Sequence, residues 1–146
     1  MFLNILVAFD GTPPAKRALE HAVDLARAMN SMLTLILVAP QPAQSAAVAG
    51  ISSERMRKEL DDWARRLLGE ATAELPDDVI AHTVQRTGDA GPEIVKELER
   101  GSYDLIVLGS RARGKARERL LGSVNGYVHF HSKVPLLSVP ENSALV

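Results

Sequence analysis

The sequence contains no cysteine among its 146 residues. This absence excludes disulfide bonds, cysteine nucleophiles and thiolate metal sites together. No apolar run approaches the ~20 residues that a membrane-spanning helix needs, so we expect no membrane partner. The formal net charge is only −1, so no overall field attracts nucleic acid, and we expect no nucleic-acid partner either. Any site for an anion must therefore be local.

The amino-terminal residues MFLNILVAFD lack both the basic segment and the small-residue cleavage site of a secretory signal. Hydrophobic residues make up 46% of the chain and charged residues 24%, which is ordinary for a folded globular protein. The length fits one domain with a substantial core. We therefore expect a single cytoplasmic domain over residues 1–146.

Short apolar runs alternate along the chain with segments whose apolar residues recur at helical spacing. The runs 3–9 (LNILVAF) and 33–39 (LTLILVA) are apolar at nearly every position, which is typical of strands inside a parallel sheet covered on both faces. Segment 79–86 is more polar, so we expect its strand at an edge of the sheet. Strands are predicted at 3–9, 33–39, 79–86, 104–108 and 134–139, and helices at 13–29, 54–75, 91–100 and 123–132.

This alternation predicts an α/β fold, a doubly wound five-stranded parallel sheet of the Rossmann-like type, with right-handed crossovers. Ser53 is expected to cap the helix at 54–75. On the helix at 123–132, Val124, Tyr127 and Val128 are expected on one side. The buried stripe of the 54–75 helix is predicted to consist of Met56, Leu60, Trp63, Leu67 and Ala71.

Ligands of such sheets bind beyond the carboxyl ends of the strands, where the strand order reverses. Asp10 follows the first predicted strand, and a glycine-containing segment that begins at Gly109 follows the fourth. A carboxylate in this place accepts hydrogen bonds from hydroxyl or amino groups of a ligand. The alternative is that Asp10 only turns the chain together with Gly11.

The segment GSRARGKARERLLGS, residues 109–123, begins with the spacing of a Walker A phosphate loop, G-x-x-x-x-G-K. The next residue in that motif is Ser or Thr, which binds magnesium, but here it is Ala116. Gly122 also interrupts any long helix that would follow. Since the metal ligand is the part that catalysis needs, the segment is not predicted to be a P-loop.

The same segment has the ingredients of a different anion site. Glycines let backbone amides approach phosphate oxygens closely. Ser123 begins the following helix, so its hydroxyl and the first free amides lie at the positive end of a helix dipole. Five basic residues and Glu118 give a local charge of +4, enough to attract a triphosphate in a nearly neutral protein. The basic residues are Arg111, Arg113, Lys115, Arg117 and Arg119.

These residues resemble the nucleotide loop of the universal stress protein family, G-x2-G-x9-G-[ST]. Gly109 and the pair Gly122-Ser123 stand with twelve residues between them, as that pattern requires. The opening ILVAFDGT, the order of elements and the closing strand VPLLSV are also similar, so the resemblance covers essentially the whole chain. One position departs from it: Ala112 replaces the second glycine, and Gly114 follows two residues later.

The resemblance implies a homodimeric regulatory module of the stress response that binds an adenine nucleotide and hydrolyses it weakly or not at all. ATP is the expected ligand, with or without Mg²⁺, and ADP and AMP remain open. Asp10 would lie near the adenine and ribose, and the strand at 134–139 would pair with its copy in the dimer. The expected nucleotide-binding residues are Ala8, Asp10, Val38, Leu108, Gly109, Arg111, Gly114, Gly122, Ser123 and Val124.

The alternative function is a dimeric interaction protein of the same family that binds no nucleotide, and Ala112 favours it. No pattern in the chain places a nucleophile beside a base, so we do not expect an enzyme. His129 and His131 are two residues apart on a predicted helix and point in different directions, so we expect no metal site.

Overall fold

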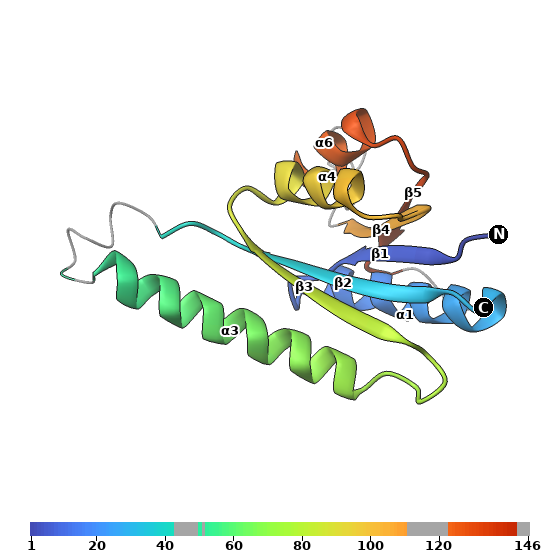
Figure 1. Ribbon diagram of the computed structural model, residues 1–146, viewed down its shortest axis with the longest axis horizontal. Coiled ribbons are helices and arrows are strands. Elements are labelled where there is room, and N and C mark those ends of the chain that lie inside the picture. The colour runs from blue at the N-terminus through green and yellow to red at the C-terminus, as the bar shows by residue number, and fades with distance from the viewer. Residues whose placement is uncertain (43–49, 51, 111–122, 143–146) are drawn as a thin grey trace.

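The computed structural model describes residues 1–42, 50, 52–110 and 123–142, in which strands and helices alternate (Figure 1). Every bound lies within two residues of its predicted position. The strands, which are all parallel, are β1 (Asn4–Ala8), β2 (Met32–Ala39), β3 (Ala81–Thr87), β4 (Leu105–Ser110) and β5 (Leu136–Pro140). The helices are α1 (Pro13–Met29), α3 (Ser53–Ala73), α4 (Ala90–Arg100) and α6 (Ser123–His131).

The strand order in the sheet is β3-β2-β1-β4-β5. The chain first adds strands outward from β1 to β3, then crosses back and places β4 on the other side of β1. Strand order therefore reverses between β1 and β4. This arrangement confirms the predicted doubly wound parallel sheet, and the polar strand β3 lies at an edge as expected.

Both faces of the sheet are covered by helices, so there are two apolar cores (Figure 1). Helices α1 and α3 pack on one face, against side chains such as Ile5 and Val7 of β1. Helices α4 and α6 pack on the other, where the alternate residue Leu6 meets Ile106 of β4. This double burial explains why the central strands are apolar at nearly every position.

Helix α3 differs from its prediction in its cap and in its buried stripe. Ser52, not Ser53, is the capping residue, and its Oγ accepts a hydrogen bond of 3.1 Å from the amide of Arg55. The buried residues are Ala64, Leu68 and Ala71, whereas Met56, Leu60, Trp63 and Leu67 are only half-buried. Helix α3 packs over β2 and the edge strand β3, so only a narrow row of its side chains meets the sheet. No helix in the described residues is both long and apolar enough to cross a membrane.

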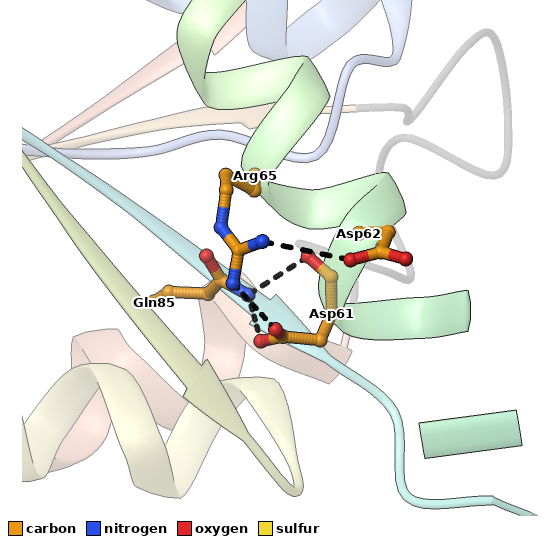
Figure 2. A network of polar contacts seen from close by, with 4 residues as sticks. All are labelled: Asp61, Asp62, Arg65 and Gln85. Carbon is orange, nitrogen blue, oxygen red and sulfur yellow. Dashed lines mark hydrogen bonds and ion pairs between the residues drawn. The ribbon is translucent and has the colours of Figure 1, made fainter. Parts of the chain in front are cut away.

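A polar network joins α3 to the edge strand β3 (Figure 2). Gln85 of β3 donates through Nε2 to Oδ1 of Asp61, at 2.5 Å, and to its backbone carbonyl, at 3.1 Å. Arg65 pairs with Oδ2 of Asp61 at 2.7 Å and with Asp62 at 3.5 Å. The side chains of Asp61, Asp62 and Arg65 are about half exposed or more, so each ion pair contributes at most about 1 kcal/mol.

A second polar network lies between α4 and the sheet and is largely buried. Glu97 of α4, which is 7% exposed, accepts hydrogen bonds from Arg86 of β3 at 2.9 Å and from the hydroxyl of Tyr103 at 2.8 Å. Burial raises the pKa of Tyr103 above 10.0, and the hydrogen bond to Glu97 raises it further. The phenol therefore stays protonated in the folded chain at a pH where it ionises in the unfolded chain.

This raised pKa predicts a loss of stability in base. The contribution of Tyr103 is fully present below pH 10 and is lost as the pH rises through the folded-state pKa, because only the unfolded chain then releases the proton. The free energy of unfolding, measured with urea from about pH 9 to about pH 11, should fall less for Tyr103→Phe than for the wild type. Tyr127→Phe is the matched control and should decline as the wild type does. A Tyr103→Phe decline as steep as that of the wild type would contradict the prediction.

Candidate functional site

A cavity of about 360 Å³ opens at the carboxyl ends of β1, β2 and β4. It lies where the strand order reverses, on the side of the sheet that α4 and α6 cover. In doubly wound sheets this is the place where ligands bind. The sequence therefore predicted the position of the cavity through Asp10 and Gly109, both of which line it.

One wall of the cavity is apolar and comes from the sheet and helix α4. Ala8 of β1 lies beside Ile36 of β2 in the strand register, and its small side chain leaves space between the larger neighbours. Ile94, which is almost fully buried, closes the α4 side. A mostly apolar pocket with few polar groups suits a planar ring system such as a nucleobase. The apolar lining residues of this wall are Ala8, Ile36, Val38, Ala90, Ile94 and Leu108.

Asp10 lies at the mouth of the cavity and also shapes the chain. Its Oδ1 accepts hydrogen bonds from the amide of Thr12 at 3.0 Å and from the Thr12 hydroxyl at 2.5 Å. Gly11 between them has a φ of 79°, which favours glycine. The two interpretations of Asp10 are thus compatible, because one carboxylate oxygen makes the turn while the residue lines the cavity.

Gly109 is held closely against the start of helix α1. A Cβ atom at this position would come within 2.4 Å of the carbonyl carbon of Pro14, 2.5 Å of its oxygen and 2.8 Å of the amide nitrogen of Ala15. All three are backbone atoms that cannot rotate away. Packing of α1 on β4 therefore requires glycine here, whatever ligand is bound.

Asn125 is a lining residue that the sequence did not single out. It is 6% exposed, and its Nδ2 donates a hydrogen bond of 2.8 Å to the carbonyl oxygen of Gly109. Among the residues of α6 whose burial the structure describes, Asn125 and Val128, three positions apart, are buried. Tyr127, which was expected on the same side of the helix as Val124 and Val128, is 36% exposed. The signal in the sequence was a polar residue between apolar ones near the start of a short helix.

The structure brings together most of the predicted site residues that it describes. Ser123 is the first residue of α6, close in sequence to the lining residues Val124 and Asn125. Arg111, Gly114 and Gly122 lie outside the described residues, as does Ala112. The predicted residues that line the cavity are Ala8, Asp10, Val38, Leu108, Gly109 and Val124.

A second hollow, of about 440 Å³, lies between α1 and α3 on the opposite face of the sheet. It is lined by four acidic residues, Glu20 and Asp24 of α1, Glu70 of α3 and Glu74 directly after α3. Among the described residues that line it, Lys16 is the one cation. Four carboxylates with one ammonium repel an anionic ligand. For a phosphate-bearing ligand, the cavity at the strand ends is therefore the better site.

Comparison with known proteins places the chain in a family. Residues 1–140 match the model of the universal stress protein family, and the chain belongs to that family. A curated relative, universal stress protein YxiE of Bacillus subtilis (strain 168), is 29% identical, and the match covers 95% of this chain and 99% of the relative. The resemblance predicted from the sequence is confirmed.

Solved structures show the same fold. The hypothetical protein MJ0577 is 25% identical with a TM-score of 0.81, and the match covers 99% of both chains. A universal stress protein in complex with cAMP is 23% identical, with a TM-score of 0.60 over 94% of this chain and 97% of that one. A universal stress protein family protein of Arabidopsis thaliana with AMP bound is 21% identical, with a TM-score of 0.70 over 97% and 93%.

Proposed function

We propose that this chain is an adenine-nucleotide-binding regulatory module of the stress response. The observation that carries the proposal is the cavity at the reversal of strand order, which is lined by apolar side chains of the sheet and α4 and by the first turn of α6. Adenine nucleotides occupy two structures of the same fold, one with cAMP and one with AMP. ATP is the proposed ligand, with ADP and AMP as alternatives.

Each part of the nucleotide has a matching part of the cavity. The base lies against Ala8, Val38 and Ile94, where apolar surface is available. The phosphates lie toward Ser123, because the free amides at the start of a helix attract anions. Arg111, Gly114 and Gly122 are proposed from the sequence pattern to complete the phosphate site, with or without Mg²⁺. The module is proposed to sense the nucleotide and not to turn it over.

Isothermal titration of the purified chain with ATP, ADP, AMP and cAMP tests this function, with GTP as a control for the base. We expect an adenine nucleotide to bind and GTP to bind more weakly. Absence of binding at millimolar nucleotide would contradict the proposal. The variant Ala112→Gly then separates the two functions, because it restores the second glycine of the family pattern. If only this variant binds, the natural chain is the nucleotide-free interaction protein.

We propose that β5 pairs with its copy in a homodimer. The amide of Ile106 donates to the carbonyl of Pro135, at 3.0 Å, so residues 135, 137 and 139 direct their backbone groups toward β4. Leu136 and Ser138 therefore direct their amides and carbonyls away from it. Within the described residues no strand pairs with this side of β5, and an open edge of this kind is a template for strand pairing.

Replacing Ser138 with proline should convert a dimer into a monomer. Proline removes an amide donor on the outer side of β5 only, and edge strands tolerate proline in that orientation. Ser138→Val keeps the amide and is the matched control. Multi-angle light scattering at micromolar concentration should report twice the chain mass for the wild type and Ser138→Val. A monomeric wild type, or a dimeric Ser138→Pro, would contradict pairing through β5.

A further inference from the structure

The carboxamide of Asn125 is fixed in one orientation. Its Nδ2 donates to the carbonyl oxygen of Gly109, an atom that accepts hydrogen bonds and cannot donate them. A flipped amide would place two acceptor oxygens against each other, so the assignment of the oxygen and nitrogen follows from the partner. The Oδ1 atom is therefore an acceptor held in place by the end of β4.

This acceptor is buried and has no hydrogen-bond partner among the described residues. Asn125 itself is 6% exposed and lines the cavity. Buried side-chain oxygens are nearly always paired, because an unpaired one loses its hydration without compensation. A donor from outside the described residues would satisfy this oxygen, and the cavity that Asn125 lines is a place from which a ligand could supply one.

The chemistry of Oδ1 decides which part of a nucleotide fits it. Phosphate oxygens and the ring nitrogens of adenine are acceptors and repel it, so the partner is a hydroxyl or an amino group. Asn125 follows Ser123 by two residues on α6, next to the proposed phosphate position, while the proposed wall for the base comes from other elements, β1, β2 and α4. The sugar joins base and phosphate, so its hydroxyls are the donors that reach this place.

We propose that Asn125 is a specificity-determining residue whose Oδ1 accepts a hydrogen bond from a ribose hydroxyl of the bound nucleotide. The proposal rests on the function proposed above and goes beyond it, since it makes the site selective for ribonucleotides over deoxyribonucleotides. Asn125 is held through Gly109, so the same glycine that packs against α1 also sets the position of the acceptor.

The test is a set of titrations with AMP, 2′-deoxy-AMP and 3′-deoxy-AMP. The wild type should bind one of the deoxy analogues about five- to tenfold more weakly than AMP, in the upper part of the range for one neutral hydrogen bond, because the loss leaves a buried acceptor unpaired. In Asn125→Leu, which has a similar shape without the acceptor, AMP and that analogue should bind within about twofold of each other. The ratio of the affinities for AMP and the analogue within one variant does not change if the substitution only destabilises the fold.

Val124→Ala is the matched control, because Val124 lines the same cavity without a polar side-chain atom. It should weaken AMP and both analogues by one common factor. Equal binding of all three ligands to the wild type overturns the proposal, even if Asn125→Leu does not fold. Discrimination that persists in Asn125→Leu also overturns it, as does selectivity against inosine monophosphate with none against the deoxy analogues. A wild type that binds no nucleotide overturns the proposed function and this inference with it.

Discussion

Replacing Gly109 with alanine is expected to lower the free energy of unfolding by about 3 kcal/mol or more. The added Cβ would lie 2.4 Å from the carbonyl carbon of Pro14, so β4 and the start of α1 must move apart. Side chains at a crowded position can change rotamer, but here the neighbours are backbone atoms. The cost therefore reaches the upper end of what an added methyl group causes in a packed core. Urea unfolding of the purified variant measures it.

Gly126→Ala provides the control for this experiment. Gly126 lies on α6, and a Cβ built there meets no atom within 4 Å apart from its chain neighbours and the backbone of its own helix. Since alanine favours the helix more than glycine does, this variant should gain up to about 1 kcal/mol. If Gly109→Ala were as stable as Gly126→Ala, the close approach of α1 to β4 would be wrong.

Gly109 has two possible roles, phosphate access and helix packing, which the sequence pattern alone does not distinguish. Gly109 is the first glycine of the family's nucleotide loop, and its place in that pattern was interpreted as access of backbone amides to phosphate. The structure gives a packing reason that operates without any ligand. Both roles require glycine at this position, so the presence of glycine in the sequence does not show which role it has. Loss of nucleotide binding in a Gly109 variant would therefore not by itself identify a phosphate contact.

The fold could be predicted because its signals are local and repeated. The central strands are apolar on both faces, and the polar run at 79–86 marks an edge, so strand position follows from residue type. Of the residues predicted to be buried on α3, Ala71 is buried, whereas Trp63 and Leu67 are half-buried and the buried positions are the next ones, Ala64 and Leu68. Large apolar residues dominate a sequence pattern, but the close contact between this helix and the sheet favours the small side chain of Ala64.

The candidate site could be predicted only in part, because some of its residues are set by tertiary contacts. Asp10 and Gly109 follow strands directly, and the carboxyl ends of neighbouring strands meet at one edge of a parallel sheet. Asn125 has no such marker. Its burial depends on a hydrogen bond to a carbonyl that is sixteen residues away in the chain. A helix as short as α6 also contains too few residues for periodicity to define its buried side.

Replacing Ala8 with leucine should abolish nucleotide binding without unfolding the chain. Ala8 belongs to the face of β1 that packs toward α4 and α6, and it lines the cavity where the base is proposed to lie. The longer side chain would occupy that space. Affinity for AMP and ATP should fall at least about a hundredfold, which is about 2.7 kcal/mol. Stability should stay unchanged or rise by up to about 2 kcal/mol, because the leucine fills a cavity and buries apolar surface.

Weaker binding together with unchanged or higher stability would distinguish a blocked cavity from a damaged fold. Substitutions that abolish binding by damaging the structure usually also lower the free energy of unfolding. Ala8→Leu is expected to abolish binding without lowering it. Ala28→Leu adds the same side chain to the exposed surface of α1 and should leave binding unchanged. Calorimetric titration and urea unfolding of the three proteins measure both quantities. If Ala8→Leu bound AMP as tightly as the wild type and Ala28→Leu do, the base would not lie in this cavity, and the nucleotide would have to be sought elsewhere on the molecule.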